Sequence, residues 1–324
     1  MLTSEGTKPA IENNPSLDHV ISFPDSLLVK RNPLSLWRLA GKLRREEYDC
    51  VISFSRSSLV HFVAMLTGSH LCVGLDCEGS GFPLTLKVPD RKSNVADTEQ
   101  YAVKDYLDIV AALGVKSDGE QMDFCLVPRG DDHVSEFLNK VGITGDDLLI
   151  GIFPGGGQNS AETILSKRWQ VTNYADLADR LIRELGAKVI VLGGPQDNEV
   201  VLQMLRVMEN EAANACNIGN LNTFGHLLKR CAVLVTNDSL PLHLALSLKT
   251  PTVALFGPTN ARALTPRSCE RLVAIQSKLE CSPCYWKDRY PGCKEYHIPR
   301  CMNAISVQEV LSTTSSMLER HGRL

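Results

Sequence analysis

The sequence has no long apolar run, no apolar N-terminal segment and little net charge. A helix that spans a bilayer needs about 20 consecutive apolar residues, and no stretch of the 324 residues approaches that length. The first residues, MLTSEGTKPAIENNPS, are polar, unlike a secretory signal peptide. The net charge of -3 gives no general attraction to nucleic acid or anionic lipid, although a local basic patch remains compatible with it. These absences predict a cytoplasmic protein with no nucleic-acid partner.

Two common nucleotide-binding signatures are also missing. The sequence contains no Gly-Lys-Ser/Thr of a Walker loop, and no strand–G-x-G-x-x-G–helix unit with a following acidic residue. The second absence argues against a Rossmann dehydrogenase. What is present is a composition typical of soluble globular proteins, 44% hydrophobic and 22% charged, over a length that suits two domains.

Short apolar runs alternate with amphipathic segments along the chain, which predicts an α/β fold with parallel sheets built from βαβ units. We expect strands at residues 19–23, 49–54, 71–75, 148–153, 188–192, 232–236 and 252–256. Polar residues at 145–147 precede a fresh strand. We therefore expect an N-terminal domain over 1–146, a second domain over 147–305 and a C-terminal helix over 306–324.

The segment 236–259, TNDSLPLHLALSLKTPTVALFGPT, collects small and polar groups at two strand ends and one helix start. Ligands of open α/β sheets bind beyond the carboxyl ends of the strands, and a helix N-terminus adds unpaired N–H groups and a positive dipole end. Capping of the helix by Asp238 or Ser239 and packing of His243 are the structural alternatives. We expect an anionic ligand near Asp238, Ser239, His243, Gly257, Pro258 and Thr259.

A second phosphate-binding candidate follows the strand at 148–153. Gly155, Gly156 and Gly157 let the backbone adopt positive φ and approach a ligand, and Lys167 and Arg168 downstream could clamp a diphosphate. A flexible turn and a solvated basic turn remain the alternatives.

These motifs, taken in order, resemble those of the family-nine glycosyltransferases, the heptosyltransferases of lipopolysaccharide core assembly. Segment 236–259 is similar to the family's T-N-D-S-G-P…V-x-L-F-G-P-T signature. Further similar segments run along nearly the whole chain: DHVISF at 18–23, YDCVIS at 48–53, Ile152–Gly157, Lys167–Trp169, Val189–Pro195, Cys281–Cys284 and Cys301–Met302.

The resemblance implies a GT-B architecture of two Rossmann-like domains facing a cleft. The C-terminal domain would bind a nucleotide-diphosphate sugar, typically ADP-heptose, and the N-terminal domain a lipid-linked oligosaccharide acceptor. Transfer would invert the anomeric carbon without a metal or other cofactor. By family position, Lys167 would contact donor phosphate or sugar, Asp238 would hold sugar hydroxyls, and Ser239, Leu240 and the turn 257–259 would line the diphosphate.

The chain departs from the family pattern at three places. The family opens with a strand and Leu-Gly-Asp, whose Asp is the expected general base, and nothing here matches it. The catalytic residue is therefore unassigned and expected upstream of Met1, and the missing strand would leave the N-terminal sheet incomplete. Leu240 replaces a Gly at the diphosphate, where a positive φ would be strained, and Asn260-Ala261 replaces Asp-Pro. A truncated or catalytically inactive nucleotide-sugar binding protein is the alternative function.

Four of the eleven cysteines cluster near the C-terminus. The spacing of Cys281, Cys284, Cys293 and Cys301 resembles that of a four-thiolate zinc site. Seven residues separate Cys293 from Cys301, however, whereas two are typical of such a pair. Packed free thiols or a redox-sensitive pair are the alternatives to a structural zinc site.

Basic residues surround the first amphipathic segment, which suggests peripheral contact with the inner membrane. The alternative is a solvated helix face. The residues are Lys30, Arg31, Arg38, Lys42, Arg44 and Arg45.

Overall fold

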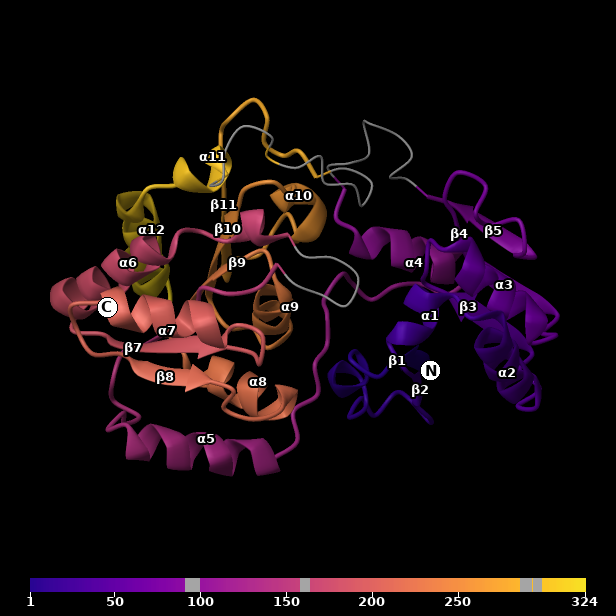
Figure 1. Cartoon of the computed structure of the whole chain (residues 1–324), viewed down its shortest axis with the longest axis horizontal. Coiled ribbons are helices and arrows are strands. Elements are labelled where there is room, and N and C mark those ends of the chain that lie inside the picture. The colour runs from indigo at the N-terminus through magenta and orange to yellow at the C-terminus, as the bar shows by residue number, and fades with distance from the viewer. Residues whose placement is uncertain (91–99, 158–163, 286–292, 294–298) are drawn as a thin grey trace. The chain divides into compact units, whose positions relative to one another are not determined.

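The computed structural model describes residues 1–90, 100–157, 164–285, 293 and 299–324. They form two compact units, each containing its own sheet (Figure 1). Unit 1 comprises Met1–Ser22, Gln121–Ala261 and Ser268–Leu324, and unit 2 comprises Phe23–Glu120 and Arg262–Arg267. The sequence-based division at residues 146 and 147 stays a prediction. No helix in the described ranges combines the length and apolarity needed to cross a membrane.

Unit 1 contains a six-stranded parallel sheet in the order β11-β10-β9-β6-β7-β8. The strands are β6 (Leu149–Phe153), β7 (Lys188–Gly193), β8 (Ala213–Cys216), β9 (Val233–Asn237), β10 (Thr252–Phe256) and β11 (Leu272–Gln276). The chain starts in the centre at β6, moves outward through β7 and β8, then returns to the other side of β6. This doubly wound order creates a switch point between β6 and β9, where ligands of such sheets bind.

Helices cover both faces of this sheet (Figure 1). One face packs against α6 (Val171–Leu185), α7 (Asn198–Val207), α11 (Arg300–Asn303) and α12 (Val307–Arg320). The other packs against α5 (Arg129–Lys140), α8 (Leu221–Arg230) and α9 (Leu240–Ser247). Because both faces are covered, β6, β9 and β10 are buried along their whole length, which explains their mostly apolar sequences.

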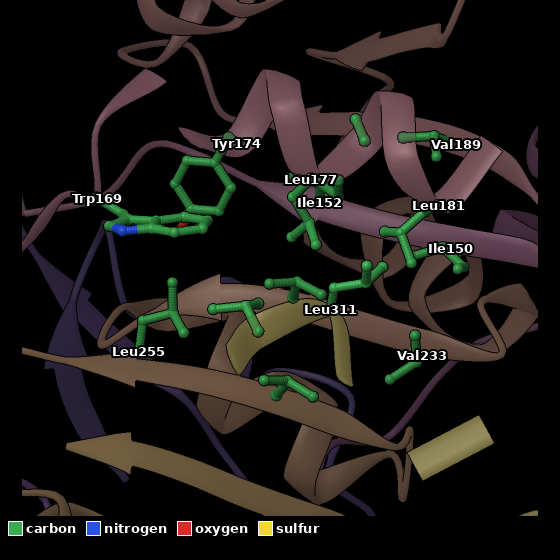
Figure 2. Close-up of a cluster of buried hydrophobic side chains, with 14 of the residues drawn as sticks. Ile150, Ile152, Trp169, Tyr174, Leu177, Leu181, Val189, Val233, Leu255 and Leu311 are labelled. Atoms are coloured by element: carbon green, nitrogen blue, oxygen red, sulfur yellow. The ribbon is translucent and has the colours of Figure 1, made fainter. Parts of the chain in front are cut away.

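Trp169 anchors the segment that leads from the sheet into α6. It is 2% exposed and meets Tyr174 edge to face at 5.0 Å between ring centroids, in the core drawn in Figure 2. Its ring N–H donates to the carbonyl of Ile305 at 3.0 Å. An aromatic pair of this geometry adds about 0.5–1.5 kcal/mol beyond its burial. The packing of Trp169 therefore fixes the position of the two basic residues that precede it.

Unit 2 has a smaller parallel sheet in the order β3-β4-β5. Its elements are α1 (Ser26–Lys30), α2 (Pro33–Arg44), β3 (Cys50–Ser53), α3 (Ser58–Leu66), β4 (Leu71–Asp76), β5 (Leu86–Pro89) and α4 (Val103–Ala111). The short strands β1 (Leu2–Ser4) and β2 (Ile21–Phe23), which belong to unit 1 up to Ser22, pair with each other. In the described chain, β3 pairs with β4 alone. Beyond the strand ends, Arg56 pairs with buried Asp90 at 3.0 Å and buried Asp105 at 2.6 Å.

The predicted α/β class with parallel sheets is confirmed. The strands expected at 148–153, 188–192, 232–236 and 252–256 correspond to β6, β7, β9 and β10 within one residue. Residues 306–324 contain the predicted final helix, α12.

Candidate functional site

A cavity of about 470 Å³ lies at the carboxyl ends of the unit 1 strands, at the switch point. It is lined by the loops that follow four of them. The lining residues include Gly156 and Gly157 after β6, Gly193–Pro195 and Asp197 after β7, Asn217–Leu221 after β8, and Asp238–Pro241 after β9, together with Lys167. The doubly wound topology therefore gathers at one edge the segments that the sequence suggested separately.

The turn after β6 depends on glycine. Gly156 and Gly157 have φ of +87° and +74°, a region that side chains rarely adopt. A Cβ on Gly157 would lie 2.4 Å from the carbonyl oxygen of Ile164. The cluster is thus a closely packed turn that faces the cavity, and a flexible turn is the poorer description.

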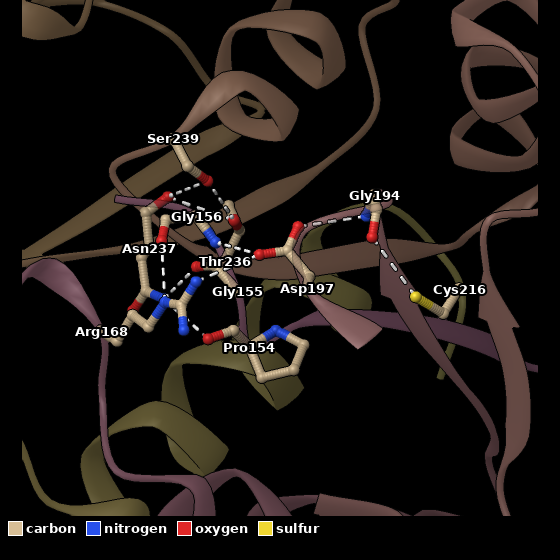
Figure 3. A network of polar contacts seen from close by, with 10 residues as sticks. All are labelled: Pro154, Gly155, Gly156, Arg168, Gly194, Asp197, Cys216, Thr236, Asn237 and Ser239. Atoms are coloured by element: carbon tan, nitrogen blue, oxygen red, sulfur yellow. Dashed lines mark hydrogen bonds and ion pairs between the residues drawn. The ribbon is translucent and has the colours of Figure 1, made fainter. Parts of the chain in front are cut away.

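Asp197 holds this turn in place, and sequence reasoning missed it. Its carboxylate accepts the backbone N–H of Gly156 at 2.9 Å and of Gly194 at 3.1 Å, and pairs with Arg168 at 3.3 Å (Figure 3). The signal available in the sequence was an acidic residue just after Gly-Gly-Pro. Asp197 thereby links the loops after β6 and β7.

Arg168 belongs to the same network and does not line the cavity. Its Nε donates to the carbonyl of Gly156 at 2.7 Å. Burial lowers the pKa of its guanidinium, and Asp197 opposes that shift. The structure places Arg168 behind the glycine turn, where it supports the loop.

Asn237, at the end of β9, is a second residue that the sequence reasoning did not single out. Its side chain is 1% exposed. The oxygen accepts the backbone N–H of Trp169 at 3.1 Å and the hydroxyl of Tyr174 at 2.8 Å, and the nitrogen donates to the carbonyl of Gly155 at 3.1 Å. Asn237 therefore fixes the segment before α6 against the glycine turn.

Lys167 and Asp238 lie together on the cavity wall. Lys167 Nζ donates to Asp238 Oδ2 at 2.9 Å, and their side chains are 19% and 6% exposed. The same Nζ lies 5.5 Å from the ring centroid of Tyr285. Among the described residues, the charged groups that line the cavity are thus Lys167 and the carboxylates of Asp197 and Asp238. An anion bound here needs backbone N–H groups as well as Lys167.

The N-terminus of α9 offers such groups. Ser239 is the N-cap residue, yet its side chain makes no capping hydrogen bond and instead contacts Thr236 and Asn237. Leu240 is the first helical residue, and its side chain is 58% exposed at the cavity. Leu240 has a helical conformation and its φ is not positive, so the strain that a positive φ would cause does not arise.

His243 lies one turn into α9, half-buried and outside the cavity lining. Burial lowers its pKa below the usual 6.5, and Lys167 adds to this shift while Asp238 opposes it. The lowered pKa favours the neutral imidazole in the folded protein.

The turn at residues 257–259 is covered by a segment from further along the chain. Gly257 accepts from Ser282 Oγ at 2.6 Å, and Pro258 accepts the backbone N–H groups of Cys284 and Tyr285, each at 2.8 Å. Thr259 is buried, and its hydroxyl has no hydrogen-bond partner in the part of the chain that is described. None of the three is part of the cavity lining, so their contact with a diphosphate stays a prediction.

The described structure does not gather the four cysteines near the C-terminus into the structural zinc site that was one of the alternatives. Across the described ranges, which include all four, no group of three or more His, Cys, Asp or Glu side chains is placed to hold a metal. Cys281 and Cys293 are exposed, whereas Cys301 is buried in α11, where a Cβ on Gly257 would lie 2.9 Å from its sulfur. Burial raises the pKa of Cys301 to about 11, which keeps it a thiol.

The chain is similar to proteins of one known family. The model for glycosyltransferase family 9 (heptosyltransferase) matches residues 36–294. Lipooligosaccharide heptosyltransferase 2 of Campylobacter jejuni is 25% identical over 304 residues, which are 92% of this chain and 84% of that protein. Lipopolysaccharide heptosyltransferase 2 of Escherichia coli K12 is 34% identical over 134 residues, 40% of this chain and 37% of its own.

Solved structures share the fold. A family 9 glycosyl transferase from Veillonella parvula superposes with a TM-score of 0.80 at 24% identity, over 98% of this chain and 87% of that one. ADP-heptose lps heptosyltransferase II of E. coli gives 0.74 at 21% identity, over 99% and 89%. The fold is of the GT-B type predicted from the sequence. Because the family model spans most of its length, this chain belongs to glycosyltransferase family 9.

Proposed function

We propose that the protein transfers a heptose from ADP-heptose to a lipopolysaccharide core acceptor, with inversion and without a metal. The observation that carries the proposal is the cavity at the switch point, with Lys167 and the uncapped start of α9 on its wall. Relatives named as heptosyltransferases of lipopolysaccharide or lipooligosaccharide support the choice of heptose as the transferred sugar and of the acceptor class.

The proposed reaction breaks the bond between the anomeric carbon and the donor phosphate. An acceptor hydroxyl attacks that carbon from the opposite face, its proton passes to a base, and the electron pair leaves with ADP. Lys167 and the N–H groups of α9 stabilise charge on the departing diphosphate. Asp238 holds sugar hydroxyls, and Ser239 and Leu240 line the diphosphate. We assign the base to none of the described residues.

Unit 2 is proposed to bind the acceptor, and α2 to contact the anionic inner membrane. Residues 26–45 contain six basic and no acidic residues, and all six basic side chains are exposed. Trp37 and Leu34 lie on the same exposed face of α2, 66% and 57% exposed, opposite buried Leu36, Ala40 and Leu43. Each basic residue near such a surface contributes about 1 kcal/mol of attraction, and an exposed tryptophan suits the interface.

The test is transfer itself, followed by mass spectrometry of a lipid A–core acceptor incubated with ADP-heptose and the full chain. An acceptor mass increased by one heptose, greatly reduced with Lys167→Met, is the expected result. Absence of the product at high enzyme concentration, with ADP binding intact, would favour the alternative of a nucleotide-sugar binding protein. The exposed Leu240 side chain in the cavity is the observation behind that alternative.

A further inference from the structure

We propose that Tyr285 is a positioning residue of the donor site. Its aromatic ring holds the Lys167 ammonium in place and keeps that positive charge available to the donor diphosphate. The inference rests on the proposed function for the identity of the ligand. It also gives the segment 281–285 a role that neither the zinc hypothesis nor the family motifs supplied.

The segment 281–285 is bound to the turn after β10 by several hydrogen bonds. The backbone N–H groups of Cys284 and Tyr285 share the carbonyl of Pro258. Gln276, the last residue of β11, donates to the carbonyl of Gly257 at 3.1 Å and to Ser282 Oγ at 3.0 Å. These contacts place the backbone of Tyr285 firmly beside the carboxyl ends of the strands.

From this position Tyr285 reaches Lys167, which comes from a different part of the chain. The Nζ atom of Lys167 is 5.5 Å from the ring centroid, within the range of a cation–π contact. The Lys167 side chain is 19% exposed, so the contact is partly shielded from water. A cation–π contact contributes about 0.5–2 kcal/mol, more as water is removed.

Asp238 and Tyr285, the partners of Lys167 within the described ranges, act differently on an incoming anion. Asp238 neutralises the ammonium, and a diphosphate must compete with that carboxylate. The ring of Tyr285 attracts the ammonium through its quadrupole and leaves its charge uncompensated. When the donor draws Lys167 away from Asp238, the ring retains a favourable contact and limits the freedom that the long side chain would otherwise regain.

The experiment compares full-length wild type, Tyr285→Leu, Tyr285→Phe and the control Tyr48→Leu by calorimetric titration with ADP. Tyr48 is 42% exposed and belongs to unit 2, whereas Tyr285 and Lys167 belong to unit 1. We expect Tyr285→Leu to weaken ADP binding about 3- to 30-fold, and Tyr285→Phe to restore it. In a Lys167→Met background, Tyr285→Leu should have no further effect. The proposal would be overturned if Tyr285→Leu weakened ADP binding equally in the Lys167→Met background, or if Tyr285→Leu alone left ADP binding unchanged.

A second measurement does not depend on ADP. Competitive acylation of lysines, read by mass spectrometry, should modify Lys167 several-fold faster in Tyr285→Leu than in wild type or Tyr285→Phe. Unchanged labelling would refute the positioning role. Wild-type protein that binds no ADP would instead count against the proposed function, and the labelling comparison would then decide the role of Tyr285 by itself.

Discussion

Replacement of Asp197 by alanine should destabilise unit 1 and loosen the glycine turn of the donor site. The change removes the acceptor of two backbone N–H groups and leaves Arg168 without its carboxylate. Breaking a buried ion pair from one side costs about 3–5 kcal/mol. Because the two side chains keep 18% and 10% exposure, solvent compensates part of this loss, and we expect about 2–3 kcal/mol.

For a unit of this size, each kcal/mol lowers the melting temperature by about 2–4 °C. Calorimetric melting of Asp197→Ala should therefore show the unit 1 transition about 4–12 °C below wild type. Asp197→Asn, which retains an acceptor oxygen, should lower the melting temperature by less than half as much as Asp197→Ala. Asp132→Ala, at an exposed position of α5 in the same unit, is the matched control. Equal melting temperatures for Asp197→Ala and Asp132→Ala would refute the reasoning.

Three further substitutions test the roles of Asp238, His243 and Trp37. Asp238→Asn releases Lys167 and should tighten ADP binding about 3- to 10-fold in calorimetry while abolishing heptose transfer; weaker ADP binding would contradict it. His243 has a lowered pKa in the folded state, so the unfolded chain binds more protons at this side chain. The free energy of unfolding should therefore fall as the pH drops below about 6.5. His243→Gln should flatten this pH dependence in urea titrations, and His70→Gln, at an exposed position, should not. Trp37→Ser should reduce co-sedimentation with anionic vesicles, whereas Val207→Ser, at a half-exposed site of unit 1, should not; equal sedimentation would exclude the proposed membrane face.

The central strands could be predicted from sequence because their burial on both faces requires continuous apolar runs. β10 was expected at 252–256 and lies there. The edge strand β8, Ala213–Cys216, was missed because it is short and contains the polar residue Asn214.

For the site, sequence reasoning named some residues that line the cavity and others, such as Arg168 and His243, that do not. It missed Asp197 and Asn237, which hold the lining loops together through hydrogen bonds to backbone groups far away in the sequence. Lys167 and Asp238 were both named, and the structure brings them to 2.9 Å. Arg168 was expected to contact the ligand because it is a basic residue close to the glycine turn. Its ion pair with Asp197, 29 residues further along the chain, instead holds its side chain behind that turn. Tyr285 lies 118 residues beyond Lys167 (285 − 167), and only the fold relates the two.

The carboxyl ends of the unit 1 strands are proposed to bind the diphosphate of a nucleotide sugar. Calorimetric titration of the full chain with ADP, in wild type and in Lys167→Met, is the decisive test. We expect saturable binding of one ADP per chain in wild type and at least about tenfold weaker binding in Lys167→Met, since a charge-assisted contact of about 1.4 kcal/mol or more is removed. No binding heat in wild type, or the same affinity in both proteins, would contradict it.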